Sequence, residues 1–347
     1  MIQVNRKKIG YNQPCFIIAE AGVNHNGDVN LAKRLIVAAI EAGADAIKFQ
    51  TFHTDNVVTR TAEKAGYQKN TTSSEESQYE MIKKLELSDE VFLELSDYAK
   101  KRGIIFLSTP FDEESVDLLD RIDVPLFKIP SGEITNFPLL KKIAEKKKTI
   151  ILSTGMATLG EVEDAFQYLK KCGADDIILL HCTTSYPASI NSVNLRAMET
   201  LRCAFKVPVG YSDHTEGITI PIAAIALGAV VLEKHFTLDR ILPGPDHKAS
   251  LEPHELREMV KAIRDIETAL GDGIKKPNKE EEAIKKVARR SIVAQCSIKA
   301  GDLLKESDLA IKRPGTGIEP RYFGSIVNRK ARIRIPKDHV IKWDMIE

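Results

Sequence analysis

Ionisable side chains recur at the ends of apolar runs, where packing alone would favour another apolar residue. Lysines and carboxylates supply opposite charges, and histidines supply metal ligands or proton carriers. Hydroxyls and amides add hydrogen-bonding groups beside them. Together these groups could bind an anion and a divalent metal ion and could move protons. In chain order they are Glu20, Lys48, Gln50, Ser108, Thr109, Lys128, Ser131, Glu133, Ser153, Thr154, Ser212, Asp213, His214, Glu233, Lys234 and His235.

The lysines predict an anion site. Lys48, Lys128 and Lys234 all lie within these polar groups, and three ammonium groups directed into one mouth would repel one another unless an anion lay among them. Ser131 and Ser153 lie next to glycine-containing turns and add donors of the kind that phosphate sites use. A single lysine is more often a surface or salt-bridge residue, so the prediction depends on their convergence.

Two histidines predict a metal site. His214 and His235 end consecutive apolar runs, so their imidazoles can face one cavity. A lone histidine is usually a polar core residue, but two of them beside Asp213 and Glu233 favour a shared divalent ion. Such a site keeps positions open for water and oxygen ligands, which suits Mn²⁺ or Mg²⁺ acting as a Lewis acid on a carbonyl group.

These residues need a scaffold that brings the ends of eight runs to one rim. Near-continuous apolar runs separated by helical patterns indicate parallel strands covered on both faces, and eight of them indicate a closed (β/α)8 barrel. An open doubly wound sheet is the alternative. Active sites of such barrels lie at the carboxyl ends of the strands. The expected strands are 16–22, 46–52, 104–110, 126–133, 150–156, 177–183, 207–214 and 230–236.

The flanking segments suggest the domain plan. Residues 1–272 should form the barrel, with an opening β-hairpin at its bottom and a polar loop at 71–77 beside its top face. A helix should begin after Ser88 and end at Gly103. Residues 273–288 are charged and contain a proline, which is typical of a linker, and 289–347 indicate a small β-rich module.

Composition excludes several functions. The net charge is +1, yet residues 289–347 hold 13 Lys and Arg against 7 Asp and Glu. This module alternates apolar and charged residues, as a folded unit does, so we expect no nucleic-acid binding. Five scattered cysteines without a CxxC pair predict neither disulfides nor structural zinc. The absence of a membrane span or a secretory signal predicts a cytoplasmic protein without a membrane partner.

Nine motifs taken in order resemble the sialic acid synthases, which include the N-acetylneuraminate and N,N'-diacetyllegionaminate synthases. They are AEAGVNHNGD, IKFQTF, STPFD, KIPSGE, LSTGMA, HCTTSYP, GYSDHT, EKHFTLD and GPDHKASLEP. The tail, with IKAGDLL and KRPGTGI, resembles the antifreeze-like (SAF) domain of those enzymes. The resemblance implies a TIM barrel followed by a small β-rich SAF domain.

The resemblance also implies roles for individual residues. His214 and His235 match the histidines that hold the metal, and Glu20 with Gln50 matches the groups beside the reacting enol. The sugar should be lined by Glu133, Tyr186 and Asp246. Phosphoenolpyruvate should be held by Lys48, Thr109, Lys128, Ser131, Ser153 and Ser212.

Two further positions bear on the sugar. Arg313, in KRPGTGI, matches an arginine that contacts the N-acyl group in the partner's active site, which implies a domain-swapped homodimer whose tail domain caps the partner's site. Thr184 departs from the asparagine of several neuraminate-forming members, and we expect it in the sugar pocket.

The implied reaction joins phosphoenolpyruvate to the open-chain aldehyde of an N-acylated amino sugar, with water adding and phosphate leaving by C–O cleavage. N-acetylmannosamine, giving N-acetylneuraminate, is the first expectation. The alternative sugar is 2,4-diacetamido-2,4,6-trideoxymannose, giving N,N'-diacetyllegionaminate; a pseudaminic precursor or a 6-phosphate sugar follows. A metal-dependent pyruvate aldolase is a rival enzyme, and an ice-binding or adhesive tail on an inactive barrel is a non-enzymatic rival.

Overall fold

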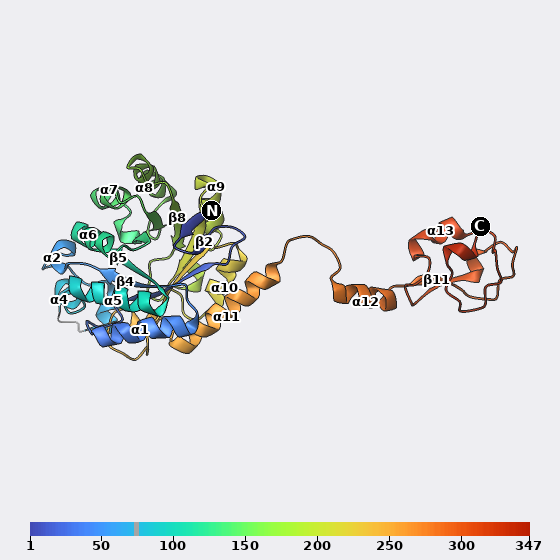
Figure 1. The fold of residues 1–347 in the computed structure, drawn as a ribbon, viewed down its shortest axis with the longest axis horizontal. Helices are drawn as coiled ribbons and strands as arrows, with labels where there is room; N and C mark the ends of the chain where they lie inside the picture. The colour runs from blue at the N-terminus through green and yellow to red at the C-terminus, as the bar shows by residue number, and fades with distance from the viewer. Residues whose placement is uncertain (73–75) are drawn as a thin grey trace. The chain divides into compact units, whose positions relative to one another are not determined.

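All eight apolar runs form strands of one parallel sheet in the computed structural model, which describes residues 1–72 and 76–347 (Figure 1). Neighbouring strands pair in the order β5-β4-β3-β10-β9-β8-β7-β6, and β5 and β6 also lie against each other, so the sheet curls into a nearly closed barrel. The predicted barrel is confirmed, and the open-sheet alternative is wrong. The strands are β3 (Phe16–Gly22), β4 (Ala46–Thr51), β5 (Ile105–Pro110), β6 (Leu126–Ile129), β7 (Thr149–Ser153), β8 (Ile177–Cys182), β9 (Val209–Asp213) and β10 (Val231–His235).

Helices cover the outside of this barrel (Figure 1). The predicted helix after Ser88 is α5, and Gly103 ends it with a left-handed φ of 82°. The long interval between β4 and β5 carries three additional short helices. The helices of this unit are α1 (Val29–Ala42), α2 (Thr54–Val57), α3 (Gly66–Thr71), α4 (Gln78–Lys83), α5 (Asp89–Arg102), α6 (Glu113–Arg121), α7 (Phe137–Ala144), α8 (Leu159–Lys171), α9 (Ala197–Phe205), α10 (Thr219–Ala226) and α11 (Pro253–Leu270).

The predicted polar loop at 71–77 falls on the boundary of what is described. Helix α3 ends at Thr71 and α4 begins at Gln78, with Ser77 capping α4 by accepting from the Glu80 N–H. Residues 73–75, at the centre of that prediction, lie outside the described residues.

Alternation along each strand separates two packing layers. Phe16 and Ile18 of β3 pack inside the barrel, whereas Ile17 and Ala19 pack outside against the helices. Inside, apolar residues fill the lower part of the barrel, and Glu20 takes the next inward position on the same strand. The apolar packing therefore ends where the polar rim begins.

A hairpin closes the bottom, as predicted. Strands β1 (Ile2–Val4) and β2 (Lys7–Ile9) pair antiparallel. Their buried residues Ile2, Val4 and Ile9 pack into the same cluster as Phe16 and Ile18.

One strand is shorter than predicted. Pro130 follows the last residue of β6, and Ser131–Glu133 forms a 3-10 turn where the sequence suggested continued strand. Proline has no N–H to donate to a neighbouring strand, which explains the stop. The turn lifts Ser131 and Glu133 out of the strand and into the rim.

The chain divides into two units, Met1–Gly271 and Asp272–Glu347. The second unit contains α12 (Lys279–Ala288), β11 (Ser291–Ala294), β12 (Leu309–Lys312) and α13 (Phe323–Ile326). Strands β11 and β12 pair antiparallel over a small core that includes Ile292, Leu304 and Ile341. Within the described residues of both units, helices lack the length and apolar character that crossing a membrane requires.

Candidate active site

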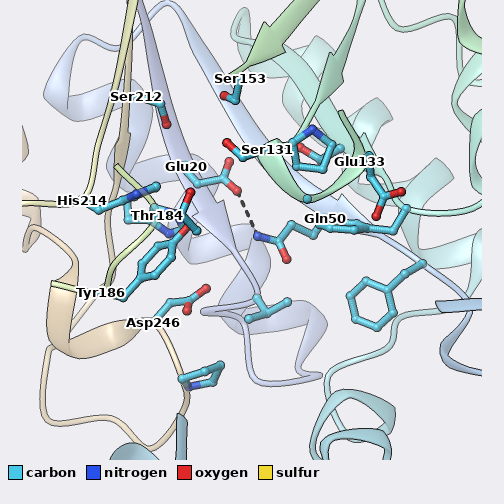
Figure 2. A pocket seen from close by; sticks show the side chains of 18 of the residues that line it. Glu20, Gln50, Ser131, Glu133, Ser153, Thr184, Tyr186, Ser212, His214 and Asp246 are labelled. Atoms are coloured by element: carbon cyan, nitrogen blue, oxygen red, sulfur yellow. Dashed lines mark hydrogen bonds between the residues drawn. The ribbon is translucent and has the colours of Figure 1, made fainter. Parts of the chain in front are cut away.

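A cavity of about 450 Å³ opens at the carboxyl ends of the barrel strands (Figure 2). Thirteen of the fourteen residues to which the family resemblance gave a role line it, so these residues lie at one rim. They are Glu20, Lys48, Gln50, Thr109, Lys128, Ser131, Glu133, Ser153, Tyr186, Ser212, His214, His235 and Asp246.

A network of two lysines and two carboxylates forms the floor. Lys48 Nζ lies 2.6 Å from Glu20 Oε2 and 3.6 Å from Glu233 Oε2, and Lys128 Nζ lies 3.4 Å from Glu233 Oε1. Thr109 Oγ1 accepts a hydrogen bond from Lys48 (2.8 Å). The two cations are therefore already paired, and the mutual repulsion assumed from the sequence is relieved by carboxylates.

Burial and neighbouring charges give the two carboxylates different pKa values. Burial raises the pKa of Glu20 to about 7, with Glu233 adding to the rise and Lys48 opposing it. Burial would also raise the pKa of Glu233, but Lys128 and Lys48 outweigh it and lower that pKa to about 2. Glu233 is thus a fixed negative charge, whereas Glu20 can gain or lose a proton near neutral pH.

Gln50 lies beside the proton-carrying carboxylate. Its Nε2 donates to Glu20 Oε1 (3.3 Å), as the dashed line in Figure 2 marks. Gly22 has a φ of +54°, and a Cβ there would lie 3.3–3.5 Å from Gln50, Glu20 and His235. This glycine lets the catalytic candidates approach the backbone closely.

A cluster of hydroxyl groups surrounds Gly155. Ser131 Oγ accepts from the Gly155 N–H (2.9 Å), and a Cβ at Gly155 would lie 2.8 Å from that Oγ and 2.2 Å from Thr184 Oγ1. Among the described residues, the buried oxygens Ser153 Oγ and Thr184 Oγ1 have no hydrogen-bond partner. Thr184 lines the cavity and belongs to this hydroxyl cluster, and its place in the sugar pocket stays a prediction.

The two histidines fit a divalent metal ion. Their ring centroids lie 5.3 Å apart. His214 Nδ1 lies 2.8 Å from the Thr183 carbonyl oxygen, an arrangement that fixes the tautomer and leaves Nε2 as a ligand. His235 is buried, and its Nδ1 has no hydrogen-bond partner among the described residues. Two neighbouring imidazoles, one with an unsatisfied nitrogen, are suited to an open metal site.

Of the charged residues expected beside the histidines, Glu233 lines the cavity with them, whereas Asp213 and Lys234 do not. The described residues contain no group of three or more histidine, cysteine or acidic side chains that could hold a metal ion. Asp213 and Lys234 pair with each other behind the barrel wall (2.5 Å), and Glu233 pairs with the two floor lysines. The prediction that Lys234 joins the anion site and Asp213 the metal site is wrong, because strand alternation turns both outward.

The remaining predicted residues face each other across the mouth. Figure 2 shows Tyr186 and Asp246 on the side of His214, and Glu133 on the opposite side. The ring centroids of Tyr186 and His214 lie 4.1 Å apart, and Asn136 donates to Glu133 Oε2 (2.7 Å). Burial raises the pKa of Asp246 to about 6. The opposed polar groups leave a gap that a polyhydroxylated ligand could bridge.

An apolar wall on one side of the cavity was not predicted. Its residues form a small cluster of their own, and most come from the segments after β3 and β4 and from the α2–α4 region. The unusual length of the interval between β4 and β5 was the only sign of it in the sequence. We call this set the apolar wall: Val23, Phe52, Val57, Ile82, Leu85 and Phe111.

Arg313, the remaining one of these fourteen residues, belongs to the second unit. It follows β12 in the second unit and is exposed.

Comparison with known families decides the relationship. A model described as the NeuB family matches residues 35–275, and an SAF domain model matches residues 289–347. The chain belongs to the NeuB family. The resemblance to sialic acid synthases is thereby confirmed, and this NeuB-family chain is an enzyme of the transferase type.

Two curated relatives share one name with each other. N,N'-diacetyllegionaminic acid synthase of Campylobacter jejuni is 55% identical over 94% of this NeuB-family chain and 98% of its own length. The enzyme of that name from Legionella pneumophila is 50% identical, covering 98% and 97%. Among solved structures, N-acetylneuraminic acid synthetase of Leptospira borgpetersenii, in complex with citrate, is 40% identical with a TM-score of 0.72, covering 82% of this chain and 94% of that one.

Proposed function

We propose that this protein condenses phosphoenolpyruvate with 2,4-diacetamido-2,4,6-trideoxymannose and water to give N,N'-diacetyllegionaminate and phosphate. The observation that carries the proposal is that two lysines, a hydroxyl cluster and a histidine pair all open into one cavity of a NeuB-family barrel. N-acetylmannosamine, the first expectation from the sequence, becomes the alternative substrate.

Phosphoenolpyruvate would lie over the floor network. Lys48 and Lys128 supply positive charge, with Thr109 and Ser212 fixing the network through hydrogen bonds to Lys48 and Glu233. The unpartnered hydroxyls around Gly155 supply donors for phosphate oxygens. The pairing of both lysines with carboxylates keeps them in place before the anion binds.

A divalent ion, Mn²⁺ or Mg²⁺, would be held by His214 and His235 and would supply Lewis-acid polarisation of the sugar aldehyde. Carbon 3 of phosphoenolpyruvate then forms the new C–C bond to the aldehyde carbon, and the aldehyde oxygen takes up a proton. Positive charge develops at carbon 2, where water adds and loses a proton. Phosphate leaves with its bridging oxygen as the bond from that oxygen to carbon 2 breaks, and the hydroxyl on carbon 2 becomes the ketone as its proton passes to the departing phosphate.

Glu20 is the residue placed to manage these charges. Its carboxylate stabilises the positive charge at carbon 2, and its pKa of about 7 lets it accept the proton that water loses. Gln50, which donates to Glu20 Oε1, holds the carboxylate's orientation.

The apolar wall supports the choice of sugar. A diacetamido-trideoxy hexose carries three methyl groups, two on its acetyl groups and one at carbon 6, whereas N-acetylmannosamine carries one methyl and more hydroxyls. Burying methyl groups against the wall is favourable at about 0.8 kcal/mol per group. Among the described residues that line the cavity, Lys48 and Lys128 are the only lysines or arginines, and both are paired, which disfavours a 6-phosphate sugar.

A homodimer in which the SAF domain caps the partner's cavity remains part of the proposal. It rests on the resemblance of Arg313 to an arginine that contacts the N-acyl group, and the positive charge of residues 289–347 against the negative remainder of the chain is consistent with it.

Phosphate release tests the reaction class. We expect release from phosphoenolpyruvate only when both Mn²⁺ and an amino sugar are present, faster with the trideoxy sugar, and loss of release on chelation with recovery on adding Mn²⁺. A pyruvate aldolase would instead consume pyruvate and sugar without releasing phosphate. The Glu20→Gln variant serves as the inactive control. Turnover of pyruvate in place of phosphoenolpyruvate would contradict the proposal.

A further inference from the structure

A fully buried ion pair lies directly behind the histidine pair. Lys234 and Asp213 have side chains with 0% exposure, and Lys234 Nζ lies 2.5 Å from Asp213 Oδ2. They occupy the outer face of β9 and β10, opposite each other in the strand register. Each immediately precedes a histidine, because Asp213 comes before His214 and Lys234 before His235.

The ion pair holds the stretch of backbone around His214, which lies beyond the end of the strand pairing. Register between β9 and β10 ends at Asp213 and Lys234, so His214 lies just beyond the paired residues. Lys234 Nζ also donates to the Thr215 carbonyl oxygen, on the far side of His214. The Lys234 ammonium group therefore contacts the residues on both sides of His214. Lys234 itself directly precedes His235.

Asp213 is in turn held from both sides. Tyr211 Oη donates to its Oδ1 (2.9 Å), and the Thr215 N–H and hydroxyl donate to the same carboxylate (3.2 and 3.0 Å). On the inner face of the same strands, Ser212 donates to Glu233 (2.9 Å). The ends of both strands are thus tied together on their two faces.

Stability alone does not explain this pair. Neighbouring outward positions such as Leu232, Leu179 and Phe49 are apolar and pack well against the helices. Replacing a buried ion pair by well-packed apolar residues is often neutral or stabilising, so stability gives little reason for charged groups in such a layer, whereas a need for defined geometry does. Here the geometry concerned is the 5.3 Å spacing of two imidazoles.

We infer that Lys234 and Asp213 are positioning residues that set the spacing of His214 and His235 and so determine the affinity for the divalent ion. This inference rests on the proposed function, because it assumes that the histidines bind metal. Neither side chain lines the cavity, so both act through the histidines. Loss of the pair should weaken metal binding about 10- to 100-fold, as for other residues that orient metal ligands.

The test measures Mn²⁺ affinity of the full chain directly, by electron paramagnetic resonance of free Mn²⁺. A single change at Lys234 would leave a buried negative charge and endanger folding, so the main variant is the neutral double substitution Asp213→Asn with Lys234→Met. We expect its Mn²⁺ Kd to rise 10- to 100-fold, the KM for phosphoenolpyruvate to stay within about twofold at saturating Mn²⁺, and turnover to recover as Mn²⁺ is raised.

Leu35→Ala is the matched control, because Leu35 is buried in the same layer and, being apolar, takes no part in the hydrogen bonds that hold Asp213 and Lys234. It should lower the melting temperature and leave the Mn²⁺ Kd unchanged. If the double variant does not fold, Asp213→Asn with Lys234→Leu, which likewise leaves no buried charge, decides by the same measurement. A variant that folds and binds Mn²⁺ as tightly as the parent overturns this inference and leaves the proposed function intact. A parent that binds no Mn²⁺ overturns both.

Discussion

Lys48 Nζ lies 2.6 Å from Glu20 Oε2, and the two residues stand opposite each other on neighbouring strands β4 and β3. Both side chains are almost completely removed from water, so the ammonium group and the carboxyl group determine each other's charge state. The network extends to Glu233 and Lys128 and forms the floor of the cavity.

The pKa of Glu20 predicts how the rate depends on pH. Burial raises that pKa to about 7, so the carboxylate form, which the proposed mechanism needs, is lost as pH falls through 7. We expect kcat/KM to fall about tenfold per pH unit below that value and to level off above it. Glu20→Gln should lower kcat by roughly 10²–10⁴-fold and abolish this limb. A profile that stays flat between pH 6 and 8 in the parent enzyme would contradict the assigned role.

Adjacent hydroxyls on β5 provide a matched pair. Thr109 faces the cavity and accepts from Lys48, whereas Ser108 faces outward and lies 2.7 Å from Thr51 Oγ1. Thr109→Val removes a hydrogen bond to a charged group, worth about 1.5 kcal/mol or more. It should raise the KM for phosphoenolpyruvate at least tenfold, while Ser108→Ala leaves that KM unchanged. Equal effects of the two variants in steady-state assays would argue against this arrangement.

Arg313 tests the role of the SAF domain. Arg313→Ala should raise the KM for the sugar more than the KM for phosphoenolpyruvate, because the arginine is proposed to contact the N-acyl group of the sugar. Arg334→Ala, another exposed arginine of the same unit, should change neither. Equal loss of affinity for both substrates would rule out the assignment. Light scattering that shows a monomer would rule out the dimer.

A substitution of Asp45 should change the stability of the protein without changing its catalytic activity. Its buried carboxylate accepts from the Ile17 N–H (2.9 Å), Lys7 Nζ (2.6 Å) and Arg264 (2.9 Å), so it joins the hairpin, β3 and α11 at the bottom of the barrel. Asp45→Ala should lower the free energy of unfolding by about 2 kcal/mol. Exposed Asp97 on α5 is the control. A urea midpoint shifted no further than in Asp97→Ala would show that these contacts contribute little.

Much of the fold could be predicted from the sequence because its physical signals are local. Each barrel strand is a short apolar run, and such runs become parallel strands whose carboxyl ends share one rim. The end of α5 followed from Gly103, which adopts the left-handed backbone that glycine favours. The end of β6 could have been predicted from Pro130, which donates no hydrogen bond.

Prediction from the sequence failed on two kinds of feature. One is the face of a strand on which a side chain lies, and the other is contact between residues that are far apart in the sequence. Lys234 stands between Glu233 and His235, so alternation along the strand places its side chain on the other face. The apolar wall joins residues from separate loops, and no period in the sequence connects Val23 with Phe111. The pairing of each floor lysine with a particular carboxylate is likewise a property of the closed barrel.

The most direct test of the account compares kcat/KM for the two candidate sugars, measured as phosphate release at saturating phosphoenolpyruvate and Mn²⁺. Contacts between methyl groups and a hydrophobic pocket discriminate by about 10- to 200-fold. We predict that 2,4-diacetamido-2,4,6-trideoxymannose is preferred over N-acetylmannosamine by at least tenfold. An equal or reversed preference would contradict the account and restore N-acetylneuraminate as the product.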